Sequence, residues 1–168
     1  MYNYESKLVD SSRLTADIIV ADIGNSDKKY TEILELTLRD EYPKSMRAAR
    51  ILALATRNNC SLFIPHLPKV IDSIGSLKVE GVKRGFLYIL AELPVELTEE
   101  MLGIVTDCCF TWLTDTKEAI AIRYYAIEIL VKDVHLRTSP YRATSNYRQR
   151  LAKVLFRDVI HSAWIQTL

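Results

Sequence analysis

The residues best suited to chemistry in this chain form a basic stripe near its C-terminus. Five polar side chains recur there at steps of three or four residues, namely Asn146, Arg150, Lys153, Arg157 and His161. This spacing places them on one face of a helix. The segment before and at the start of that helix adds Tyr141, Arg142, Tyr147 and Arg148. Such groups suit either single-stranded nucleic acid or an acidic protein segment, and a solvated outer face would show the same stripe.

The other reactive side chains show no catalytic or metal-binding pattern. Cys60, Cys108 and Cys109 lack the spacing of a zinc or haem site. We expect buried or inert thiols, because free cysteine packs as a small hydrophobe. His66 and His135 have no His or Glu partner at ligand spacing, and we expect both to be non-catalytic. The sequence predicts no metal and no cofactor.

Motifs of the common enzyme classes are also absent. The chain contains no Gly-x-Gly-x-x-Gly, no Gly-x-x-x-x-Gly-Lys-Ser/Thr, no Gly-x-Ser-x-Gly and no His-Glu-x-x-His. These patterns cradle phosphates, present a nucleophile or hold zinc. We therefore predict that the chain is not an enzyme.

Composition is that of an ordinary globular domain. Of the 168 residues, 49% are hydrophobic and 26% are charged, with a net charge of +1, so we expect one domain spanning residues 1–168. No apolar run approaches the roughly 20 residues of a membrane span. The first residues lack the basic-then-apolar layout of a secretory signal. We expect a cytoplasmic protein that does not bind membranes.

Charge is unevenly distributed along the chain. Through residue 41 there are nine acidic and five basic side chains. From His135 onward there are six basic side chains and a single acidic one, Asp158. Opposite charge at the two ends suits oriented binding, and it also suits head-to-tail self-association.

Helical periodicity runs through most of the chain, and we find no strand pattern. Ser26, Ser61, Thr98 and Asp115 are the expected N-terminal caps. The predicted helices are a Ser26-capped one through residue 38, 44–58, a Ser61-capped one ending at Gly75, 78–93, a Thr98-capped one through residue 113, 116–136, and about 146 to the C-terminus.

Three of these helices begin with the same pattern, an apolar residue followed by a basic one. The starts are Met46-Arg47, Val82-Lys83 and Ile122-Arg123, which lie 36 and 40 residues apart, with a fainter copy at Arg13-Leu14. Such a period is typical of stacked helix pairs, in which no unit buries its apolar face alone. The expected repeats span approximately 9–40, 43–75, 78–114 and 116–168.

These units resemble HEAT repeats of the armadillo-like class. The resemblance is carried by the three starts above, by the acidic residues Glu41, Glu80 and Glu118 near them, and by the segment 61–67, which is similar to a second HEAT helix. It implies an all-α, right-handed α–α superhelix of about four HEAT-like helix pairs. It also implies that Arg47, Lys83 and Arg123 pair with acidic turn residues and tie neighbouring units together.

Two functions follow from this resemblance and from the charge pattern. The leading hypothesis is a non-catalytic scaffold that binds a protein or an acidic peptide on a concave face lined by second helices. The alternative is nucleic-acid binding through the basic C-terminal loop and helix. One family of DNA glycosylases uses HEAT-like repeats. No motif of this chain matches that family, so no residue can be assigned as its catalytic aspartate.

Overall fold

A computed structural model describes residues 3–136 of the chain, with side chains through residue 132. This part is all-helical and contains no strand. Its α-helices are α1 (Tyr4–Lys7), α2 (Arg13–Ile23), α3 (Asp27–Leu38), α4 (Lys44–Asn58), α5 (Leu67–Ile74), α6 (Glu80–Glu92), α7 (Glu99–Thr114) and α8 (Ile120–Leu136). Two short 3₁₀ turns, η1 (Cys60–Leu62) and η2 (Ile64–His66), precede α5.

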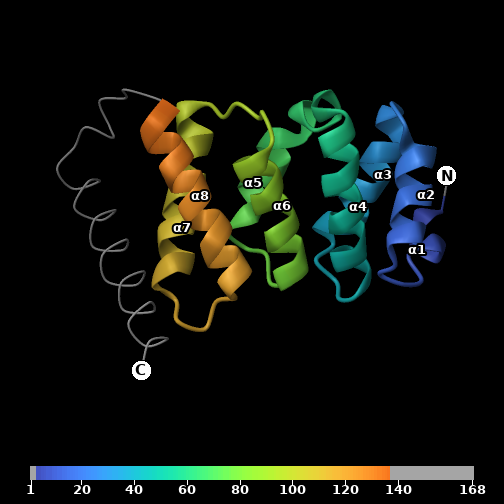
Figure 1. Cartoon of the computed structure of the whole chain (residues 1–168), viewed down its shortest axis with the longest axis horizontal. Coiled ribbons are helices and arrows are strands. Elements are labelled where there is room, and N and C mark those ends of the chain that lie inside the picture. The colour runs from blue at the N-terminus through green and yellow to red at the C-terminus, as the bar shows by residue number, and fades with distance from the viewer. Residues whose placement is uncertain (1–2, 137–168) are drawn as a thin grey trace.

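The helices lie in two layers that advance together along the long axis (Figure 1). Helices α2, α4, α6 and α8 stand side by side in one layer, each packed on the next. Helices α3, α5 and α7 form the other layer, where α3 packs closely on α4 and α7 on α8. This arrangement confirms the predicted α–α superhelix of HEAT type. The repeat limits given above stay a prediction.

One continuous apolar core runs between the layers. Ile33 of α3, Leu52 of α4 and Phe86 of α6 are fully buried and belong to the same hydrophobic cluster, which continues to Ile129 of α8. Each helix contributes residues spaced three or four apart, as an amphipathic helix must. Each unit thus shields the apolar face of the next from water, which is the stabilising principle of a repeat array.

Polar contacts repeat with the period of the array. The side-chain amide of Asn59 donates to Asn25 Oδ1 (2.9 Å), and the carboxylate of Asp40 accepts the backbone N–H of Val79 (2.9 Å). The partners are 34 and 39 residues apart in sequence. These bonds join turns of neighbouring units, so the polar edges of the stack are linked as well as its core.

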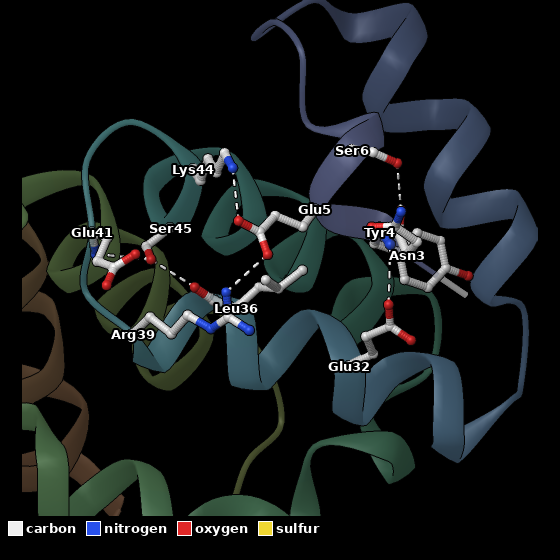
Figure 2. Close-up of polar contacts among 10 residues, drawn as sticks. All are labelled: Asn3, Tyr4, Glu5, Ser6, Glu32, Leu36, Arg39, Glu41, Lys44 and Ser45. Atoms are coloured by element: carbon white, nitrogen blue, oxygen red, sulfur yellow. Dashed lines mark hydrogen bonds and ion pairs between the residues drawn. The ribbon is translucent and has the colours of Figure 1, made fainter. Parts of the chain in front are cut away.

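The first helix is held by similar contacts (Figure 2). Glu5 lies between Arg39 Nη1 (2.9 Å) and Lys44 Nζ (2.7 Å), and the backbone N–H of Tyr4 donates to Glu32 (3.0 Å). The phenol of Tyr4 donates to Asp22 Oδ2 (2.5 Å), and its ring is fully buried. A four-residue helix is too short to be stable alone, so these tertiary contacts order α1.

Two close approaches set the register between α4 and α6. A Cβ at Gly85 would lie 3.0 Å from Ala49 Cβ, and one at Gly81 would lie 2.2 Å from Met46 Cγ. Because residues 81 and 85 meet residues 46 and 49 in the same order, the two helices run parallel. The missing side chains allow the helix axes to approach closely.

The predicted helix from Ser61 to Gly75 is wrong in its first half. The chain there forms η1 and η2, and regular helix begins only at Leu67. Pro65 and Pro68 explain the break, because proline lacks the N–H that a helix interior uses and restricts the residue before it. Asn59, rather than Ser61, is the local cap: its Oδ1 accepts from the Ser61 N–H at 3.1 Å.

The predicted helix 116–136 also begins too early, since α8 starts at Ile120. Asp115 Oδ1 accepts from Lys117 N–H (2.9 Å), which closes a turn two residues on rather than a helical capping box. Ser26 occupies an N-cap position, but its side chain makes no capping bond. Thr98 caps α7 as predicted, through Met101 N–H at 3.3 Å.

Candidate interaction surface

The basic stripe predicted from the sequence lies outside the described residues. That prediction covers Tyr141, Arg142, Tyr147, Arg148, Arg150, Lys153, Arg157 and His161, whose arrangement therefore stays a prediction. The candidate surface developed below lies on α4, α6 and α8, and α2 flanks it.

Among the described residues, one of the three expected acid–base pairs forms, at Lys83, and neither Arg47 nor Arg123 has an ion pair there. Lys83 Nζ lies 2.6 Å from Glu118 Oε2, and this pair ties α6 to the turn before α8, as predicted. The prediction is wrong for Arg47, whose Nη1 donates to the backbone carbonyls of Leu8 (2.7 Å) and Val9 (2.8 Å). The reason is local. The 8–11 segment passes beside α4, and the long Arg47 side chain reaches its backbone carbonyls.

The outer face of α4 carries a row of side chains spaced by three or four residues. Arg47, Arg50, Leu54 and Arg57 occupy it, and Arg50 and Arg57 are exposed. Helix α4 has α2 and α6 on either side and α3 behind it. Because Arg50 and Arg57 are exposed, we assign the row to the side of α4 that these neighbours leave open. On α6 and α8 the side chains that are at least partly exposed include basic and aromatic residues. We call the whole set the Arg–Tyr surface, and it consists of Arg50, Arg57, Arg84, Tyr88, Tyr124 and Tyr125.

Three tyrosines pack edge to face across α6 and α8. The ring centroids of Tyr88 and Tyr125 lie 6.0 Å apart at 81°, and those of Tyr124 and Tyr125 lie 5.1 Å apart at 71°. These are the separations and angles that aromatic pairs prefer. Tyr124 remains 50% exposed. The Tyr124 ring is therefore held against Tyr125, which itself packs on Tyr88, and half of the Tyr124 residue surface stays accessible to a ligand.

Two carboxylates set the electrostatics of the tyrosine cluster. The charge of Glu128 is the main cause that raises the pKa of Tyr124. Burial is the main cause that raises the pKa of Tyr125, and the charge of Glu92 adds to it while Arg84 opposes it. Both phenols consequently stay neutral well above physiological pH and keep their O–H donors.

The three arginines of the surface have no carboxylate partner among the described residues. Arg50 Nη1 donates to the carbonyl of Ser11 (2.5 Å), which leaves its other N–H groups toward solvent. The described part of the chain gives Arg57 and Arg84 no ion pair. A guanidinium presents five donors in a planar fork, so these side chains can recognise carboxylates or phosphates in a bidentate manner.

Unlike these arginines, Lys132 is not available to a ligand. Its Nζ donates to the backbone carbonyls of Leu90 (3.2 Å), Ala91 (3.2 Å) and Leu93 (2.9 Å) at the end of α6. Burial lowers its pKa. Positive charge is favourable at a helix C-terminus, where carbonyls lack intrahelical partners. Lys132 thus ties α8 to α6.

The cysteines and the described histidine have structural surroundings. Cys109 is buried in the core, and burial raises the pKa of the Cys108 thiol, which makes the reactive thiolate scarce. His66 stacks on Tyr30 with ring centroids 6.0 Å apart. Its Nε2 lies 3.6 Å from Asp27 Oδ1, so it joins the turn before α5 to α3. Trp112 is buried in α7.

The Arg–Tyr surface was not identified from the sequence. Its residues lie inside the repeated stretches, where they contribute to the repeat pattern rather than to a separate motif. The row 47, 50, 54 and 57 has helical spacing, and it is the signal that could have indicated an exposed basic face. Which side of α4 stays exposed depends on its neighbours.

The described residues contain no cluster of His, Cys, Asp or Glu that could hold a metal ion. Within the same part of the chain, each helix falls short of the length and apolar character that a bilayer-spanning helix requires.

Comparison with known families agrees with the fold. A family model described as a HEAT repeat domain matches residues 6–136. This range covers more than three quarters of the chain and runs from α1 to the end of α8. Neither the curated proteins nor the solved structures contain a significant match. The extent of the family match, together with the two-layer stack, shows that this chain belongs to the HEAT repeat family.

Proposed function

We propose that this protein is a non-catalytic HEAT scaffold that binds a protein or peptide partner on the Arg–Tyr surface. This surface belongs to the layer of α2, α4, α6 and α8, and not to α3, α5 and α7, which are the second helices of the expected repeats and the face that the sequence favoured. One observation supports the proposal most: exposed arginines and a packed tyrosine cluster share the outer side of α4, α6 and α8. The described structure pairs none of these arginines with a carboxylate.

The chemistry of these side chains fits protein recognition. Arginine and tyrosine are enriched among the residues that carry most of the binding energy at protein interfaces. Tyrosine supplies a large apolar area with a polar tip, at a low cost in side-chain entropy. Here the helices that bear them share one packed core, so the surface is rigid before a partner arrives. Such preorganisation favours binding.

Site-specific photo-cross-linking in the native cells tests this proposal. A photoreactive phenylalanine analogue at position 124 lies on the Arg–Tyr surface, and the same analogue at position 72 lies exposed on α5 in the other layer. We expect a discrete, stoichiometric protein adduct from position 124 and none from position 72. Equal adducts from both positions, or adducts with chaperones only, would contradict the proposal.

The charge of the C-terminal segment supports a second candidate, nucleic-acid binding through the basic stripe. It predicts that a labelled single-stranded oligonucleotide binds with an affinity that falls steeply with salt, because bound phosphates release counterions. The variants Arg150→Glu and Arg157→Glu should then lose binding. Absence of binding at low salt, or binding that persists in both variants, excludes this candidate.

Head-to-tail self-association follows from the same uneven charge, and it also stays a proposal. It predicts oligomers that dissociate as salt rises, because exposed charges are screened over about 10 Å at 0.1 M. Light scattering at low and high salt measures this directly. A monomer at low salt excludes it.

A further inference from the structure

We infer that the Arg–Tyr surface recognises an extended acidic peptide segment that also carries large apolar side chains. This inference rests on the proposed function and assigns the chemistry of the partner. It follows from the order of side chains across the four parallel rows of the layer: apolar on α2, basic on α4 and α6, and aromatic on α6 and α8.

The central helix is the source of the positive charge. Helix α4 carries four basic residues, Lys44, Arg47, Arg50 and Arg57, and no acidic one. Lys44 is neutralised by Glu5 and Arg47 is used by backbone carbonyls, which leaves Arg50 and Arg57 for a ligand. Arg84 lies next to Gly85, the residue that packs on Ala49 beside Arg50. The stretches of α4 and α6 that carry Arg50 and Arg84 therefore lie against each other, and one segment that crosses both helices can place carboxylates at both arginines.

An exposed apolar strip flanks these arginines. Leu14 and Ile18 lie one turn apart on α2, with 71% and 59% of their surface exposed, and α2 packs on α4. Leu54 lies half-buried between Arg50 and Arg57. Apolar side chains in a partner would lose water against this strip, and the burial of apolar area favours binding. The surface therefore suits a partner that carries apolar side chains as well as acidic ones.

The other end of the surface disfavours a nucleic acid. Glu92 and Glu128 lie beside the tyrosines, close enough to raise the pKa of Tyr124. A phosphate backbone that crossed all the helices would have to pass these two carboxylates. A peptide can place neutral or basic residues there while its acidic residues meet Arg50 and Arg84. We therefore favour a peptide over a polyphosphate.

The size of the surface fixes the length of the probe. Neighbouring helix axes lie about 8–10 Å apart, so four helices span roughly 25–30 Å. An extended chain covers about 3.3 Å per residue, so about eight or nine residues cross the layer. A 12-residue peptide is long enough to reach every row.

A random library of 12-residue peptides, selected against the full chain at low ionic strength, tests this inference. We expect enriched peptides with net negative charge and at least one large apolar residue. The variant Arg50→Glu/Arg84→Glu should weaken their binding at least tenfold. The variant Lys28→Glu also replaces a basic side chain by an acidic one. Lys28 is exposed on α3, in the other layer, so this variant should leave binding unchanged. Arg57→Glu/Arg84→Glu repeats the test without removing the bond from Arg50 to Ser11.

The outcomes separate the two proposals. Enrichment of neutral or basic peptides overturns the acidic assignment and leaves the proposed function standing. If the enriched peptides bind the Lys28→Glu and Arg50→Glu/Arg84→Glu variants equally well, the assignment to this surface is wrong. Displacement of acidic peptides by an equal concentration of 12-residue oligothymidylate shows a general polyanion site, which also overturns it. No enrichment of any peptide contradicts the proposed function itself.

Discussion

At the scale of single residues, the ion pair between Lys83 and Glu118 is the least exposed one in the described structure. Only 14% and 11% of these two side chains are accessible to solvent, and the Lys83 ammonium lies 5.8 Å from the centre of the Trp112 ring. Water cannot readily replace either partner in such a place. Loss of one partner leaves a mostly buried charge without compensation.

We predict that Lys83→Met lowers the free energy of unfolding by about 2–3 kcal/mol, because Glu118 is then left unpaired. Urea denaturation measures the change. Lys69→Met is the matched control: its pair with Glu35 is about half exposed on both sides, and its loss should cost less than about 1 kcal/mol. The double variant Lys83→Met/Glu118→Gln should recover part of the loss. Equal costs for Lys83→Met and Lys69→Met would contradict this reading of the pair.

At the scale of helices, the glycines of α6 determine how closely two units approach. A Cβ at Gly85 meets Ala49 Cβ at 3.0 Å and the Ala49 carbonyl oxygen at 3.3 Å. Those atoms belong to the backbone and first side-chain atom of α4, so they can retreat only if the helix moves. The contact therefore has little freedom to adjust.

Gly85→Ala should destabilise the protein by about 1 kcal/mol, since overpacking outweighs the gain in helix propensity. Gly103→Ala is the control, because no atom lies within 4 Å of the new Cβ in α7. It should stabilise the protein by about 0.5–1 kcal/mol, the usual advantage of alanine over glycine in a helix. Thermal unfolding of both variants gives the comparison. A stabilising Gly85→Ala would show that the α4–α6 contact is looser than described.

The first helix should respond to acid before the rest of the array. Hydrogen bonds from Lys44 and Arg39 hold the pKa of Glu5 below its ordinary value of 4.5, and that from Tyr4 holds the pKa of Asp22 below 3.8. A carboxylate with a lowered pKa in the folded state stabilises it above the unfolded pKa. That stabilisation is lost as pH falls through the lowered value.

We therefore predict that the hydrogen-exchange protection of the Leu8 amide, which bonds to the Tyr4 carbonyl, falls below about pH 4. Amides in the middle of α4 should keep their protection over the same range. In Glu5→Gln, Leu8 should already be poorly protected at neutral pH and should depend less on pH. Protection of Leu8 that is unchanged down to pH 3 would contradict the role of these carboxylates.

At the scale of the whole molecule, stability depends on contacts between neighbouring units. Leu52 in α4 is fully buried between units on both sides, whereas Ile19 in α2 is buried near the start of the array. In a linear stack, a cavity in the centre weakens two interfaces and one near the end weakens fewer.

Leu52→Ala should therefore cost about 3–4 kcal/mol and lower exchange protection in α4 and α6 together. Ile19→Ala should lower protection in α1 and α2, with a smaller effect on α6. Residue-resolved hydrogen exchange of the two variants distinguishes these patterns. Identical, global loss of protection in both variants would show an all-or-none unit rather than a stack with local openings.

The sequence predicted the features that depend on neighbours along one helix. Helix 44–58, the Thr98 cap and the absence of strands in the described part are confirmed, because apolar spacing and capping act within a few residues. The same local logic failed at 61–67 and 115–119. There the chain forms turns, shaped by two prolines and by the bonds of Asn59 and Asp115.

Only the tertiary structure decided which side of each helix is exposed and how the units align. The repeat pattern matches Met46 with Val82 and Ile122, yet Met46 is only partly buried, whereas its neighbour Ser45 is buried as Val82 and Ile122 are. Register between α4 and α6 depends on the fit of Gly85 against Ala49, across 36 residues of sequence. Spacing along one helix is a local property and can be read from a single sequence. The exposed side, and with it the Arg–Tyr surface, results from packing among helices that are distant in sequence.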